Sequence, residues 1–148
     1  MATIIQGDEL RTLNLGRQVT KSVTQAGAAT QNVFTVSGGA VAITSLWGRV
    51  TTAITVAGTT KLSANPTAGT TVDLCTATDL GTTDTVAGEI LVITKGASIA
   101  IGADDMTGFP LVVETGVIEH TVATGGDGVI KWYCTYVPLD DGATVTAA

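Results

Sequence analysis

The clearest structural pattern in the chain is Val129-Ile130-Lys131-Trp132-Tyr133-Cys134-Thr135-Tyr136-Val137-Pro138. Alternate side chains of a β-strand point to opposite faces. One face of this stretch therefore carries Ile130, Trp132, Cys134 and Tyr136. Burying two large aromatic rings is worth roughly several kcal/mol, so we expect this face to enter the core. Pro138 lacks a backbone donor and ends the pairing.

Shorter segments of similar character fill the rest of the chain, separated by glycine-rich turns. The abundant Val and Thr residues are branched at Cβ and favour pleated strands, and no long helical periodicity competes with them. Regular short strands of this kind favour a sandwich or a barrel. Strands are expected at residues 19–24, 31–36, 41–56, 61–64, 70–75, 89–94, 97–101, 111–114 and 116–122.

Glycines and prolines define the expected connections. The apolar parity of residues 41–56 changes near Gly48, which predicts a bulge or bend there. The glycine pair at residues 38–39 and the glycine-rich run at residues 125–128 are interpreted as hairpin turns. A hairpin is also expected across residues 65–69. Residues 76–88 are expected to form an exposed loop, with one helical turn after Thr76 or Thr78 as an option. Residues 102–110 are expected to form a second polar loop.

The length of 148 residues suits one domain. Residues 1–17 show neither strand nor helix periodicity and are interpreted as an extended N-terminal arm. Residues 18–139 are assigned to the sandwich, and residues 140–148 to a C-terminal tail that lies along the surface. The expected fold is an all-β, single-domain antiparallel β-sandwich or jelly-roll-like barrel with an extended N-terminal arm.

Composition limits the classes of partner. Charged residues make up 14% and hydrophobic residues 45%, which makes a lone, fully solvated monomer a poor interpretation. The net charge of −6 argues against nucleic acid, since phosphate binding needs clustered Lys and Arg. No apolar run approaches the roughly 18 residues of a membrane span, and no signal peptide is evident, so synthesis in a cytoplasm is expected.

Basic residues concentrate early in the chain, because Arg11, Arg17, Lys21 and Arg49 are four of the seven. This region is therefore a candidate for docking on an acidic surface, while scattered solubilising residues are an equally good interpretation. Cys75 and Cys134 lack metal-ligand spacing and are expected as free thiols in a reducing compartment, with a disulfide as the alternative.

Catalytic patterns are weak. The single histidine, His120, alternates with Ile118 and Val122 and is interpreted as a hydrogen-bonded strand residue rather than a catalytic base. The neighbouring carboxylates Asp104-Asp105 and Asp140-Asp141 diverge in an extended chain, so solvated loop charges are favoured over an acid/base pair or a weak Ca²⁺ site. No enzyme activity, cofactor or metal is expected.

Three segments resemble small structural proteins of tailed bacteriophages, a group that includes capsid decoration or cement proteins. They are residues 34–54, 61–75 and 128–139, which together cover roughly half of the chain. The resemblance implies a homo-oligomer, expected as a trimer, that sits on the capsid exterior. Its partner would be the major capsid protein, whose lattice it would stabilise by bridging capsomers.

The expected docking residues lie in the N-terminal arm, which would bind the capsid that the resemblance implies. The apolar candidates are Ile4, Ile5, Leu10 and Leu13, and Arg11 and Arg17 would supply complementary charge. Two alternatives remain open: a tail or head-fibre adhesion module that binds surface glycans, and a virion-borne glycosidase. The sequence leaves open the oligomer number, the host, the position on the particle and any binding of glycan or Ca²⁺ by a loop.

Overall fold

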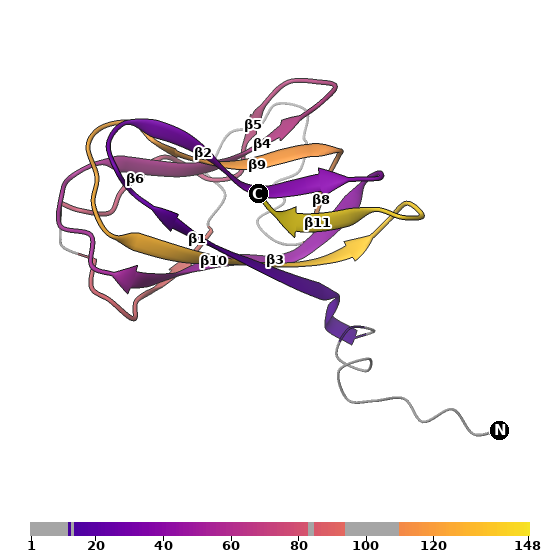
Figure 1. The fold of residues 1–148 in the computed structure, drawn as a ribbon, viewed down its shortest axis with the longest axis horizontal. Coiled ribbons are helices and arrows are strands. Elements are labelled where there is room, and N and C mark those ends of the chain that lie inside the picture. Colours follow the sequence, from indigo (N-terminus) through magenta and orange to yellow (C-terminus); the bar gives the residue numbers. More distant parts are fainter. Residues whose placement is uncertain (1–11, 13, 83–84, 94–109) are drawn as a thin grey trace.

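The protein folds into two antiparallel β-sheets packed face to face, as seen in a computed structural model (Figure 1). The structure describes residues 12, 14–82, 85–93 and 110–148. The expected all-β sandwich is confirmed. The strand expected at residues 97–101 and all but the last residue of the loop expected at residues 102–110 lie outside the described residues.

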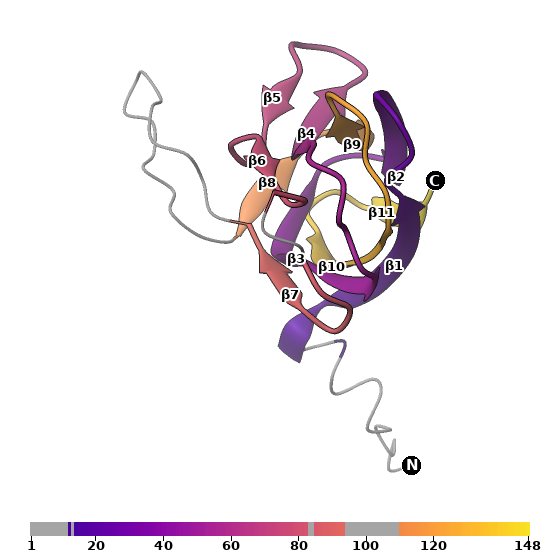
Figure 2. The same cartoon turned by 90° about the vertical axis from the view of Figure 1, so that its left-hand side faces the viewer.

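Each sheet is built around three longer strands. Sheet A has the order β1 (Arg17–Thr24), β10 (Val129–Pro138) and β3 (Val41–Thr52), with β7 (Ile90–Val92) and β8 (Leu111–Val113) both paired with β3. Sheet B has the order β11 (Thr144–Ala147), β2 (Ala29–Ser37), β9 (Gly116–Val122) and β4 (Thr59–Pro66), with β5 (Val72–Asp73) and β6 (Thr78–Asp79) both paired with β4. Figure 2 shows the two layers from the side.

The strand pairing is that of a jelly roll. Strand β1 pairs with β10, β2 with β9, β3 with β7 and β8, and β4 with β5 and β6. The chain is thus one long antiparallel hairpin rolled into two layers, in which β1 to β4 alternate between the sheets. Of the two folds expected, sandwich or jelly roll, the strand order selects the jelly roll.

This topology corrects two expected turns. The glycines at residues 38–39 join β2 in sheet B to β3 in sheet A, and residues 125–128 join β9 in sheet B to β10 in sheet A. Neither is a hairpin. Gly38 and Gly128 do adopt the positive φ values that reversals require, but local turn chemistry does not specify which sheet receives the next strand. The hairpin expected across residues 65–69 is confirmed by β4 and β5.

The core lies between the sheets. The predicted inward face of β10 is confirmed, since Ile130, Trp132, Cys134 and Tyr136 are all buried. The bulge predicted at Gly48 is at the wrong position, because Gly48 pairs regularly with Trp132. The register with β10 instead shifts at two other places, which leave Thr44 and Thr51 as the extra residues of β3. Gly48 instead provides space, because a Cβ there would lie 2.9 Å from side-chain atoms of Ile130 and Trp132.

The C-terminal segment is not a surface tail. Its residues form β11, which pairs with β2, and place Ala143 and Val145 in the core. The helical turn considered after Thr76 or Thr78 is replaced by β6 and a turn organised by the Asp79 carboxylate. That carboxylate accepts hydrogen bonds from the backbone N–H groups of Gly58, Gly81 and Thr82.

Candidate docking face

The outer face of sheet A carries an aromatic and basic cluster. Register places Trp47 beside Tyr133, and Arg49 beside Lys131, on the neighbouring strands β3 and β10. These side chains alternate with the buried residues of the same strands and therefore point away from the core. Edge strand β7 adds Val92 beside Trp47 and Ile90 beside Arg49. We call these six residues the sheet A cluster.

Its centre is a stacked ring pair. The centroids of Trp47 and Tyr133 are 4.0 Å apart, and the ring planes differ by 2°. The Lys131 ammonium group lies 5.3 Å from the Tyr133 centroid, within cation–π range. A ring pair of this kind contributes about 1 kcal/mol beyond its buried area. The stack holds two large side chains in place on the surface before any partner binds. Binding to these side chains therefore costs little additional conformational entropy.

Apolar surface borders the stack. Val92 is 69% exposed and Ile90 is 51% exposed, although both are aliphatic residues of a strand. Trp47 and Tyr133 are themselves only partly buried. Exposed aliphatic groups next to aromatic rings indicate a surface that gains free energy when a partner covers it.

Charge is distributed unevenly between the layers. The strands of sheet A contain four basic residues, Arg17, Lys21, Arg49 and Lys131, and no acidic residue. Sheet B strands contain Lys61 as their single basic residue, together with Asp73, Asp79 and Glu119. Sheet A is therefore the basic layer of a chain whose net charge is −6.

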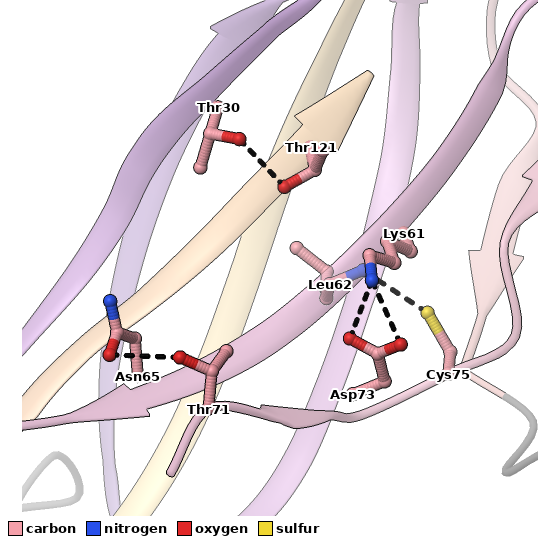
Figure 3. A network of polar contacts seen from close by, with 8 residues as sticks. All are labelled: Thr30, Lys61, Leu62, Asn65, Thr71, Asp73, Cys75 and Thr121. Atoms are coloured by element: carbon pink, nitrogen blue, oxygen red, sulfur yellow. Dashed lines mark hydrogen bonds and ion pairs between the residues drawn. The ribbon is translucent and has the colours of Figure 1, made fainter. Parts of the chain in front are cut away.

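Polar groups on sheet B are already paired with one another (Figure 3). Lys61 Nζ lies 2.8 Å from both carboxylate oxygens of Asp73, and the Thr30 and Thr121 hydroxyls lie 3.0 Å apart. The Thr71 hydroxyl donates to the side-chain oxygen of Asn65. Among the described residues, Lys61 and Asp73 form the only ion pair. Arg49 and Lys131 therefore have no carboxylate partner in that part of the chain.

The residues predicted for docking are only partly placed. Arg17 is exposed and opens β1 opposite Tyr136, so it belongs to a strand rather than to the predicted arm. Ile4, Ile5, Leu10, Arg11 and Leu13 lie outside the described residues. Leu15 is 63% exposed, and its carbonyl accepts a hydrogen bond from the Thr44 hydroxyl of β3 at 3.3 Å. The chain thus enters the domain along sheet A.

Sequence reasoning missed the sheet A cluster. Trp47 and Tyr133 are far apart in sequence, and only the register between β3 and β10 stacks them. The available signal was the alternation of β10, which assigned Trp132 and Tyr136 to the core and so left Lys131 and Tyr133 on the opposite face.

A cavity of about 270 Å³ opens between the edges of the two sheets, beside β4, β6 and β7. Its lining is mostly apolar and includes Leu62, Leu80, Leu91 and Trp132. The Cys75 thiol also lines it, and burial raises the pKa of that thiol, which disfavours the reactive thiolate. Cys75 and Cys134 are both free thiols in the structure.

His120 lies inside the sandwich and is fully buried. Its ring centroid is 6.0 Å from that of Trp132, and neither ring nitrogen has a hydrogen-bond partner. The prediction that His120 is hydrogen-bonded is therefore wrong, whereas the prediction that it lies in a strand is confirmed. Burial lowers its pKa to about 4, so the ring is neutral at pH 7.

The described residues hold neither a metal-binding cluster nor a membrane-spanning helix. They contain no group of three His, Cys, Asp or Glu side chains placed to hold a metal ion. Within the same residues, no helix has the length and apolar character needed to cross a membrane.

Comparisons with known proteins add little. No protein-family model matches the chain, and no curated protein matches it. A weak structural similarity relates it to a chain in the structure of the infectious bursal disease virus Gx strain, with 11% sequence identity and a TM-score of 0.25. The match covers 88% of this chain and 39% of the viral chain. The strand order and register by themselves define the class of the molecule, a jelly-roll domain with an aromatic and basic outer face.

Proposed function

We propose that this chain is a non-enzymatic structural protein of a virion, and specifically a decoration protein on the capsid exterior of a tailed bacteriophage. The observation that carries the proposal is the sheet A cluster, a preorganised aromatic and basic surface on a rigid sheet. Trp, Tyr and Arg are the residue types that dominate the energetics of protein interfaces. The jelly-roll topology is compatible with this role but does not by itself imply it.

Bridging explains how such a protein would stabilise a capsid. A chain that contacts several capsomers binds the assembled lattice more tightly than free subunits, and this difference in affinity shifts the equilibrium toward the lattice. A homo-oligomer, expected as a trimer, would multiply the contacts and raise the effective concentration at each site. The major capsid protein is the proposed partner, and the host cytoplasm is the proposed place of synthesis.

The proposed arm contacts complement the face. The arm enters the domain at β1, and the Thr44 hydroxyl of β3 contacts the Leu15 carbonyl at that entry. We propose Ile4, Ile5, Leu10 and Leu13 as apolar contacts with the lattice, with Arg11 and Arg17 as the charged contacts.

The titratable residues fit a role without catalysis. His120 is enclosed and neutral at pH 7, so it is poorly placed to exchange protons with a surface substrate. Burial raises the pKa of Cys134 to about 12, which keeps this thiol protonated.

Binding to empty heads tests the proposal. Purified chain is incubated with tailed-phage heads of the source particle assembled without it, and also with unassembled major capsid protein. We expect cosedimentation with heads but not with subunits, and decorated heads that survive a higher temperature. Absence of binding to intact heads contradicts the proposal. Glycan-array binding that is lost in Trp47→Ala would instead support the adhesion module.

A further inference from the structure

We infer that the sheet A cluster recognises an acidic protein surface, with the Trp47–Tyr133 stack as its energetic centre. This inference rests on the proposed function, for which it supplies the chemistry of the partner. It also makes a claim about the face itself that can be tested without a capsid.

Charge segregation is the first argument. The chain has 13 acidic and 7 basic residues, and the sheet A strands hold four of the basic ones and none of the acidic ones. Of these four, Arg49 and Lys131 lie on the outer face, whereas Arg17 and Lys21 stand opposite the core residues Tyr136 and Trp132. The outer face of the sheet A strands therefore carries two cations and no carboxylate, and such a face attracts an acidic partner.

The placement of Arg49 and Lys131 is the second argument. They lie directly opposite each other in the register of β3 and β10. Like charges in that position are destabilising. Because neither has a carboxylate partner in the described part of the chain, a carboxylate from a binding partner would relieve the repulsion and form charge-assisted hydrogen bonds.

The exposed aliphatic residues beside the ring stack are the third argument, because they distinguish an acidic protein from a nucleic acid as the partner. Duplex DNA or RNA presents a dense row of phosphates, whereas this face offers two outward cations beside the exposed aliphatic residues Ile90 and Val92. An acidic protein surface that contains apolar residues matches both parts of the face. The stacked rings lie in the row next to the two cations, beside Val92, and would be desolvated on docking.

Substitutions that remove the positive charge but keep a long polar side chain provide the test. The double variant Arg49→Gln with Lys131→Gln removes both cations, and a single Lys61→Gln on sheet B is the control for losing a basic residue elsewhere. Circular dichroism and melting curves establish that each variant is folded. Binding is measured to empty heads and, separately, to poly-L-glutamate and duplex DNA over a range of NaCl concentrations.

We expect the double variant to bind both heads and poly-L-glutamate about tenfold more weakly at low salt, with a flatter salt dependence. Lys61→Gln should bind like the wild-type protein. Trp47→Ala should weaken binding to heads without flattening the salt dependence. Trp47→Phe, which keeps an aromatic ring, should bind heads more tightly than Trp47→Ala.

The outcomes separate the two proposals. If heads do not bind the wild-type protein but poly-L-glutamate binds in a manner that depends on Arg49 and Lys131, the capsid assignment fails and the acidic-surface inference stands. If the double variant binds heads and poly-L-glutamate like the wild-type protein, the inference fails while the capsid role remains. Preferential binding of duplex DNA would also overturn the inference.

Discussion

The imidazole of His120 is enclosed by the two sheets and has no hydrogen-bond partner on either nitrogen. An unfolded chain binds a proton at this residue near pH 6.5, whereas burial lowers the pKa in the folded state to about 4. Between these values the unfolded state holds more protons, so the free energy of unfolding decreases as the pH falls. The difference amounts to about 3 kcal/mol once the pH is below 4.

We therefore predict that His120→Leu removes much of the acid sensitivity between pH 6.5 and pH 4. Urea unfolding of both proteins at pH 7 and pH 4.5 measures the difference. The variant should be at least as stable as the wild-type protein at pH 7, because it no longer buries unpaired polar nitrogens. Asp79 and Asp127 also have lowered pKa values, but their contributions are common to both proteins. Equal pH slopes for the two proteins would contradict the assignment.

Gly48 shows how a single missing methyl group permits the packing of sheet A. A Cβ at this position would lie 2.9 Å from atoms of Ile130 and Trp132. We predict that Gly48→Ala lowers the free energy of unfolding by about 1–3 kcal/mol through overpacking. Gly125→Ala is the control, because no atom lies within 4 Å of its added Cβ. Chemical denaturation compares them, and equal stabilities would rule out the steric explanation.

At the scale of elements, β11 completes the edge of sheet B. Val145 pairs with Val36 of β2 and is only 5% exposed, whereas its neighbour Thr146 is exposed. We predict that Val145→Ala lowers the free energy of unfolding by about 2 kcal/mol through lost burial and a residual cavity. Thr146→Ala, in the same strand, should change it by less than about 0.5 kcal/mol. Similar losses in both variants would mean that β11 contributes pairing but no core packing.

Element existence was more predictable than element geometry. The alternation in β10 predicted both the strand and its buried face, because the strand is long and rich in large side chains. The change of apolar parity along residues 41–56 predicted a bulge, which was assigned to the glycine nearest the change, Gly48. The register with β10 places the extra residues of β3 at Thr44 and Thr51. β11 was missed because four small residues contain too little alternation to be recognised without β2 beside them.

For the molecule as a whole, Cys134 reports global unfolding. It is fully buried in the central strand β10, and burial raises its pKa to about 12. Alkylation requires the thiolate, so the folded protein should protect this residue. We predict that in a Cys75→Ser variant the alkylation of Cys134 proceeds only through global unfolding and accelerates with urea in parallel with the unfolding equilibrium.

Iodoacetamide labelling followed by mass spectrometry measures that rate. Rapid labelling in native buffer would show that sheet A opens locally. Wild-type protein that resists labelling after unfolding without reductant would instead reveal a disulfide between Cys75 and Cys134, which are free thiols in this structure.

The sequence by itself determined that this chain is a β protein with a buried Trp132 and Tyr136, because side-chain alternation and β-branching act over neighbouring residues. Tertiary structure alone decided the jelly-roll order, the incorporation of β11 and the meeting of Trp47 with Tyr133. These features depend on the register between strands distant in sequence. Register is set by the packing of the whole roll, and no local pattern of residues encodes it.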